Sequence, residues 1–185
     1  MRSFPQSTIY KKGPHPPGFH YLSTLTPNFI GVLSMNIMNT VEQFLHESNW
    51  KYDDSRKSAG ILSTDIQGKN SSYKLYLLGS DERQTLRVFA MLNTVIPEDR
   101  RNDIAEFFIR CNYIYQMGRL DMDYSDGNVR FTWGVDVNGS ELTSKMVQTM
   151  VYTAVHCLDN TQPYILRICY GDLSPKEAFD VWKNN

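Results

Sequence analysis

The sequence has 185 residues, of which 41% are hydrophobic and 21% charged, and its 19 basic and 20 acidic side chains leave a net charge of −1 at pH 7. A chain of this length can bury enough apolar surface to fold without disulfides or metals, so a small disulfide-stapled scaffold is excluded. The balanced charge gives no field that attracts a phosphate backbone, and no apolar run reaches the roughly 20 residues that a membrane-spanning helix needs. We therefore expect one ordinary domain that binds neither nucleic acid nor membrane.

The first part of the chain differs in composition from the rest. Residues 1–41 contain no Asp or Glu, and they hold five of the eight prolines. Each proline removes a backbone donor and disfavours helix in the residue before it. Residues 1–34 are therefore expected to be a disordered or extended head that folding does not need, an extension upstream of a true start at Met35 or Met38, or a targeting peptide. Residues 35–185 are expected to form a single domain.

Four helices are predicted from apolar residues at helical spacing and from capping residues at their starts. Asn39 or Thr40 can cap the first helix, and Pro163 should kink or break the third. The fourth opens with the capping box Ser174-Pro175-Lys176-Glu177. The predicted helices begin near Thr40, Pro97, Thr143 and Ser174, and the apolar stripe of the second stops at Gly118.

Five strands are predicted between clusters of turn formers: residues 60–67, 72–79, 85–93, 120–124 and 129–137. In the last two, apolar and polar residues alternate strictly. The last two form a hairpin around Asp126 and Gly127, which we expect to be structural turn residues, with Gly127 at a positive φ. The order α-βββ-α-ββ-α-α contains no βαβ alternation. It predicts an α+β fold in which helices pack on one face of an antiparallel sheet of about five strands.

The two middle strands carry apolar residues on both faces. Tyr76, Leu78, Phe89 and Met91 occupy the positions between the residues expected to face the core. An antiparallel sheet covered on one side should leave its other face polar, so something else is expected to cover these four residues. The first helix or the head could fold over them, or they could form a dimer or partner-binding surface.

Two groups of residues suggest a chemical role, and both are better explained structurally. Asp121, Asp123 and Asp126 lack the spacing of a calcium-binding EF-hand loop and suit outward-facing strand and turn positions. The cysteines lie on or beside apolar stripes without C-x-x-C spacing, as expected of buried free thiols in a reducing compartment. No phosphate-binding, dinucleotide-binding or zinc-protease motif occurs in the sequence. We therefore expect no catalytic residues, no metal site and no cofactor.

The second half of the chain resembles the YbjN family. The resemblance covers roughly residues 40–182 in element order and leaves the first 34 residues out. It rests on these residues: Ile104-Ala105-Glu106-Phe107, Asn112-Tyr113, Leu120-Asp121-Met122-Asp123, Asp126-Gly127-Asn128-Val129-Arg130, Leu142-Thr143, Met150, Asp159, Pro163 and Tyr170-Gly171-Asp172-Leu173-Ser174-Pro175-Lys176-Glu177-Ala178.

This resemblance implies a type III secretion chaperone-like fold and a small cytoplasmic protein, described as a sensory transduction regulator, that has no catalytic activity to transfer. Fold relatives of the family dimerise and hold partner polypeptides. The function expected is therefore that of a regulatory or chaperone-like protein that binds proteins, with a homodimer expected. The alternative is a small-molecule-binding or enzymatic domain with a pocket between sheet and helices, lined by Tyr113, Tyr115, Trp133 and Tyr152.

Overall fold

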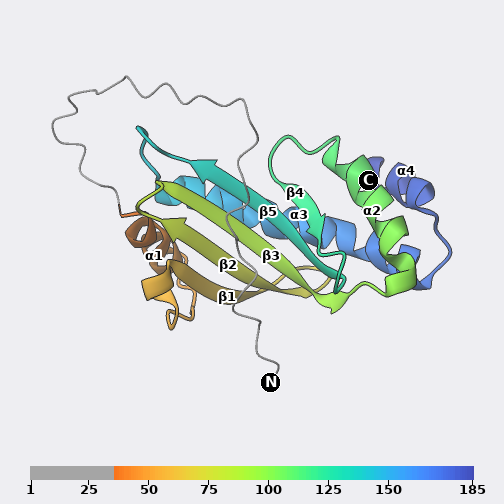
Figure 1. Ribbon diagram of the computed structural model, residues 1–185, viewed down its shortest axis with the longest axis horizontal. Helices are drawn as coiled ribbons and strands as arrows, with labels where there is room; N and C mark the ends of the chain where they lie inside the picture. The colour runs from red at the N-terminus through yellow and green to blue at the C-terminus, as the bar shows by residue number, and fades with distance from the viewer. Residues whose placement is uncertain (1–35) are drawn as a thin grey trace, which may run out of the picture. The chain divides into compact units, whose positions relative to one another are not determined.

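The computed structural model describes residues 36–185, and the expectations for the head lie outside these residues (Figure 1). Its helices and strands follow in the predicted order, and two short 3₁₀ turns lie at Lys57–Ala59 and Glu98–Arg100. The elements are α1 (Ile37–Glu47), β1 (Ile61–Gln67), β2 (Ser72–Ser80), β3 (Thr85–Val95), α2 (Arg101–Asn112), β4 (Arg119–Met122), β5 (Asn128–Asp136), α3 (Ser144–Tyr170) and α4 (Pro175–Lys183).

The strands form one antiparallel sheet with the order β1-β2-β3-β5-β4. The long strand β3 lies at its centre and pairs with β2 and β5. Phe89 of β3 is opposite Tyr76 on one side and Thr132 on the other. The pairing of β3 with β5 shifts register between Met91 and Val95, which marks a bulge near the end of β3.

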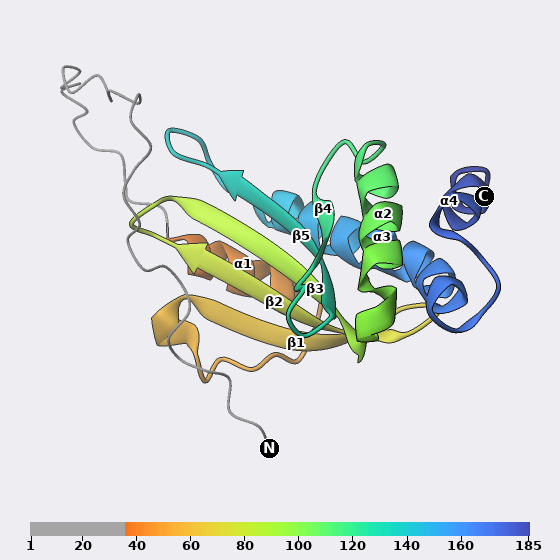
Figure 2. The same ribbon diagram turned by 45° about the vertical axis from the view of Figure 1, so that its right-hand side comes forward.

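Helices α1 and α3 cover one face of this sheet, which we call the inner face. Figures 1 and 2 show α3 running behind β3 and β5, whereas α2 and α4 lie beyond the β4 side. Figure 2 shows α1 behind β2. Most of the side chains that alternate towards α1 and α3 are fully buried; they include Tyr73, Leu75, Leu77, Leu86, Val88, Ala90 and Phe131. The predicted α+β fold, with helices on one face of a five-stranded antiparallel sheet, is confirmed.

Helix α1 begins earlier than predicted. Its N-cap is Asn36, whose side-chain oxygen accepts a hydrogen bond from the Asn39 backbone at 2.9 Å, so the prediction of Asn39 or Thr40 as the cap is wrong. The backbone N–H of Ile37 donates to the Asp81 carboxylate at 2.7 Å. A turn far along the chain thus satisfies a backbone donor at the helix start, and no local pattern could indicate this.

Helix α2 is shorter than predicted at both ends. Pro97 precedes a 3₁₀ turn, and the helix ends at Asn112 rather than near Gly118. The Asn112 side chain donates to the Leu120 carbonyl at 3.0 Å and accepts from the Leu120 N–H at 2.8 Å. These two hydrogen bonds connect the end of α2 to β4, and residues 113–118 between the two elements are not helical.

Helix α3 has 27 residues and continues through Pro163, so the helix does not break at this proline. A proline inside a helix leaves the carbonyl four residues earlier without its usual donor. Here that carbonyl belongs to Asp159, and it accepts a hydrogen bond from the Asn70 side chain at 2.9 Å. The β1–β2 turn thus supplies the missing donor. The fourth helix starts as predicted, with a capping box between Ser174 and Glu177.

Candidate functional site

The four apolar residues singled out in the sequence share the face of the sheet opposite α1 and α3. We call this the outer face. In the strand register, Tyr76 pairs with Phe89, Met91 lies two residues beyond Phe89, and Leu78 lies two residues beyond Tyr76. Directly opposed and diagonal positions on one face lie close enough for side-chain contact. The structure therefore brings the four positions together.

The outer-face residues differ in exposure. Phe89 is 9% exposed, whereas Tyr76, Leu78 and Met91 are half-buried. Two guanidinium groups lie over the Phe89 ring, that of Arg130 at 4.6 Å from its centroid and that of Arg87 at 5.5 Å. Arginine stems and cation–π contacts thus shield the ring from water without the help of a helix.

Asp121 organises the charges at the β4 side of the outer face. Its carboxylate lies 2.9 Å from Nε of Arg119 and 3.5 Å from Nε of Arg130, and it accepts a hydrogen bond from the Thr132 hydroxyl at 2.8 Å. One carboxylate is therefore shared between two arginines. Lys74 pairs with the exposed Asp65 at 3.2 Å on the opposite side of the face. Among the described residues, Arg87 has no carboxylate partner.

A second exposed apolar surface lies on α2, and the sequence reading missed it. Ile109 is 71% exposed and Tyr113 is 93% exposed, and their spacing puts them on one side of the helix end. Ile114 lies two residues beyond the end of α2 and is 41% exposed. The spacing of Ile109 and Tyr113 was visible in the sequence, but it gives no sign of which side faces water.

The predicted pocket between sheet and helices is not formed by its four proposed residues. Tyr113 is almost fully exposed, and Tyr115 packs edge-on against Phe131 and donates to the Cys157 carbonyl at 3.4 Å. Tyr152 lies elsewhere, in contact with Phe44. The structure therefore gathers no such aromatic pocket.

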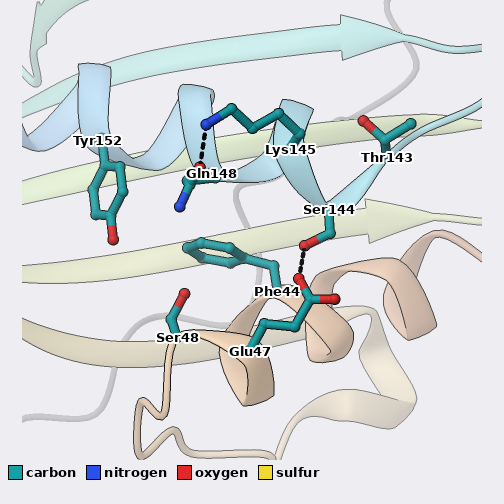
Figure 3. Close-up of a pocket in the computed structure, with 8 residues that line it drawn as sticks. All are labelled: Phe44, Glu47, Ser48, Thr143, Ser144, Lys145, Gln148 and Tyr152. Atoms are coloured by element: carbon teal, nitrogen blue, oxygen red, sulfur yellow. Dashed lines mark hydrogen bonds between the residues drawn. The ribbon is translucent and has the colours of Figure 1, made fainter.

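Tyr152 instead lines a cavity of about 580 Å³ between α1 and the first turns of α3 (Figure 3). Its volume is within the range of ligand sites, but within residues 36–185 Phe44 and Tyr152 are its only aromatic lining residues. Hydrogen bonds from Ser144 and Gln43 hold the pKa of the Glu47 carboxyl below its usual value. The hydrogen bond between Ser144 and Glu47 thus links the start of α3 to α1.

The buried polar cluster around Asp159 is a structural site. Its carboxylate accepts from the backbone N–H groups of Lys69 and Asn70 at 3.0 and 2.9 Å and from the Tyr73 hydroxyl at 2.7 Å. Burial raises the pKa of Asp159, but the hydrogen bonds from Tyr73, Asn70 and Lys69 outweigh burial and lower it overall. A side chain at Gly68 would collide with this carboxylate. The cluster fixes the β1–β2 turn to α3.

The thiols show no sign of reactivity. Burial raises the pKa of Cys111 to about 12 and that of Cys157 and Cys169 to about 11, so all three stay protonated at neutral pH. They are free and buried. In residues 36–185, no group of three or more His, Cys, Asp or Glu side chains could hold a metal ion.

Asp126 and Gly127 lie in the loop that joins β4 to β5. The Asp126 carboxylate accepts from the Asn128 N–H at 2.9 Å, and the Gly127 N–H donates to the Asp123 carbonyl at 2.7 Å. Gly127 has a φ of 76°, and a side chain there would collide with the Ile96 carbonyl. Both residues thus shape the backbone of the loop.

A solved structure with a TM-score above 0.5 supports the fold of this chain, and two others are similar at lower scores. The crystal structure of "YbjN, a putative transcription regulator from E. coli" matches with a TM-score of 0.51 at 12% identity, over 70% of this chain and 90% of that one. The HopA1–SchA chaperone–effector complex contains a chain with a TM-score of 0.44 at 13% identity, over 66% of this chain and 88% of that one. A chain of the ExsC–ExsE complex matches with a TM-score of 0.49 at 15% identity, over 75% of this chain and 100% of that one.

Other comparisons concern sequence and hydropathy. No curated protein matches this chain. In the described part of the chain, none of the helices is both long enough and apolar enough to cross a membrane. A family model described as "Putative bacterial sensory transduction regulator" matches residues 38–167, which include every strand and most of α3. The chain therefore belongs to the YbjN family.

Proposed function

We propose that this protein is a non-enzymatic regulatory or chaperone-like protein that binds another polypeptide through the outer face of its sheet. One observation carries this proposal: Tyr76, Leu78 and Met91 are half-buried apolar side chains around Phe89, on a face that α1 and α3 leave uncovered. The family description supports a regulatory role. Contiguous apolar surface of this kind marks interaction sites in soluble proteins.

The outer face offers enough apolar area to contribute to binding. Four large apolar side chains present on the order of a few hundred Å², and burial contributes roughly 25 cal/mol per Å². Burying this area would therefore release several kcal/mol before the entropy of association takes its share. The surrounding arginines and aspartates give the polar rim that protein interfaces commonly have.

The proposal includes self-association and a reducing compartment. A second copy of this chain is one partner that the outer face could bind, and the exposed Ile109 and Tyr113 offer another surface for a homodimer. Three free buried cysteines suit a cytoplasmic location, where thiols stay reduced.

Photo-crosslinking tests the outer face directly. A photoreactive phenylalanine analogue replaces Tyr76 in one protein and Tyr170 in a control protein, since Tyr170 is 66% exposed and ends α3 on the other side of the sheet. We expect a discrete polypeptide to crosslink at position 76 and not at position 170 in native lysate. Unlabelled wild type should compete with it, and a Tyr76→Ser, Leu78→Ser, Met91→Ser variant should not. Equal crosslinking at both positions, or none at position 76, would contradict the proposal.

Analytical ultracentrifugation separates the two surfaces that could support a homodimer. The triple serine variant removes apolar area from the outer face, and an Ile109→Ser, Tyr113→Ser variant removes it from α2. Circular dichroism confirms that each variant is folded. Loss of the dimer in the first variant assigns self-association to the outer face, and loss in the second assigns it to α2. A wild type that stays monomeric at high concentration would remove self-association from the proposal.

A further inference from the structure

The outer face carries more positive charge around Phe89 than its own carboxylates neutralise. Asp121 is shared between Arg119 and Arg130, and Arg87 has no carboxylate partner among residues 36–185. Asp136 also lies on this face, opposite Thr85, but within residues 36–185 it forms no ion pair with an arginine; Asp121 holds the arginine ion pairs of the face. The centre of the face therefore holds an excess of guanidinium groups beside apolar side chains.

The exposed side chain of Arg87 lies close to two neighbouring residues of the sheet. It lies opposite Gly134 of β5, and a Cβ atom at Gly134 would come within 3.0 Å of the Arg87 Cγ. A glycine inside a strand weakens it and often marks a place where another group approaches closely. Here it leaves room for the Arg87 stem, while Phe89 holds the Arg87 guanidinium on its ring.

Two like charges over one aromatic ring form an arrangement that an anion would stabilise. The guanidinium groups of Arg87 and Arg130 both lie within 5.5 Å of the Phe89 centroid. Guanidinium groups bind carboxylates through paired hydrogen bonds, and such charge-assisted bonds are stronger than neutral ones. Apolar side chains of the same ligand could contact Tyr76, Leu78 and Met91.

We propose that the polypeptide bound at the outer face is acidic: it places an Asp or Glu carboxylate against Arg87 and Arg130 and apolar side chains on Tyr76, Leu78 and Met91. This inference rests on the proposed function and adds the chemistry of the partner. Charge complementarity selects partners in interfaces of this kind.

A nucleic acid fits the same face less well. Single-stranded nucleic acids bind to aromatic rings on which bases can stack, together with a strongly basic groove. Phe89 is only 9% exposed and is covered by the arginines, and Asp65, Asp121 and Asp136 interrupt the basic residues. The whole chain also has a net charge of −1.

Fluorescence anisotropy with three labelled probes tests the inference on the whole chain of 185 residues. The probes are a short peptide of repeated Glu-Leu-Ser, the same peptide with Gln in place of Glu, and a uridine oligonucleotide of equal length. Wild type is compared with an Arg87→Gln, Arg130→Gln variant. The control is an Arg110→Gln, Arg167→Gln variant, which removes the same charge from exposed ion pairs on α2 and α3.

We expect wild type to bind the Glu peptide about tenfold more tightly than the Gln peptide at low salt. The Arg87 and Arg130 variant should lose most of this preference, and the control should keep it. If wild type binds the two peptides with equal affinity, the proposal that the partner is acidic is wrong. The proposed function is then still decided by the crosslinking experiment. Failure of both peptides to bind also overturns the acidic partner. Tighter binding of the oligonucleotide assigns the face to nucleic acid and overturns both proposals.

Discussion

Alternate residues of β2 and β3 face two different environments. Leu75 and Leu77 point to the inner face and are fully buried under helices, whereas Tyr76 and Leu78 point to the outer face and are half-buried. The inner face is closed by α1 and α3. The outer face is shielded by its own arginines, whose stems and guanidinium groups lie over Phe89. The difference separates residues that hold the fold from residues that we propose to contact a partner.

The sharpest way to test this contrast is a pair of neighbouring leucines. Leu77→Ala removes a fully buried side chain and should lower the free energy of unfolding by about 3 kcal/mol, because it leaves a cavity under the helices. Leu78→Ala should cost less than about 1 kcal/mol, since its site is open to water on one side. Urea denaturation measures both. Equal costs would mean that the outer face is as closely packed as the inner one.

The buried Asp159 cluster extends the contrast to charged groups. Asp159→Asn should lower the free energy of unfolding by about 2 kcal/mol, because the amide accepts fewer of the bonds from Lys69, Asn70 and Tyr73. Asp65→Asn on the outer face is the control and should have little effect, since Asp65 is 79% exposed. Similar losses in the two variants would show that the cluster adds nothing to stability.

The same cluster predicts a direction for the dependence of stability on pH. The folded pKa of Asp159 lies below its ordinary value of 3.8, so its stabilising contribution is fully present above that value. The contribution is lost as the pH falls below 3.8 and through the folded pKa. Thermal unfolding followed from neutral to acidic pH should therefore show a smaller acid destabilisation in Asp159→Asn than in wild type. An unchanged acid profile would argue against ionised Asp159 in the fold.

Two glycines on either side of β5 compare a packed and an open environment at the same backbone angle. Gly127 and Gly139 both have a φ of 76°, but a side chain at Gly127 would collide with Ile96 and one at Gly139 would meet nothing within 4 Å. Both alanine variants bear the strain of a positive φ, and only Gly127→Ala adds a collision. Gly127→Ala should therefore lower the free energy of unfolding by about 1 kcal/mol more than Gly139→Ala. Chemical denaturation measures the difference, and its absence would show that the loop moves freely away from Ile96.

The smallest expected effect on stability comes from a residue of the proposed binding surface. Arg87→Gln should lower the free energy of unfolding by about 0.5 kcal/mol, because it removes one exposed cation–π contact with Phe89. A thermal scan with circular dichroism measures the change. A loss comparable with that of Leu77→Ala would place Arg87 among the residues that hold the fold.

The sequence predicted this fold well where the pattern is local. The turn formers Gly68-Lys69-Asn70 helped to place the first strand over residues 60–67, and the structure has it at Ile61–Gln67. The capping box at Ser174 placed the start of α4. The alternation of side chains along a strand put Tyr76, Leu78, Phe89 and Met91 on one face, because the side-chain period of a strand is two. What binds that face stays a prediction.

Features that depend on distant partners were not predictable. Asp81 satisfies the start of α1, Asn112 fastens the end of α2 to β4, and Asn70 satisfies the carbonyl that Pro163 leaves free. The exposure of Ile109 and Tyr113 was also missed, because an apolar residue on a helix reveals its side only when the neighbouring elements are known. The sequence by itself determined the elements, their order and the two-faced strands, since these follow from local periodicity and capping. Only the tertiary structure decided where helices end and which charges meet on the outer face, because those depend on hydrogen bonds and contacts between residues far apart in the chain.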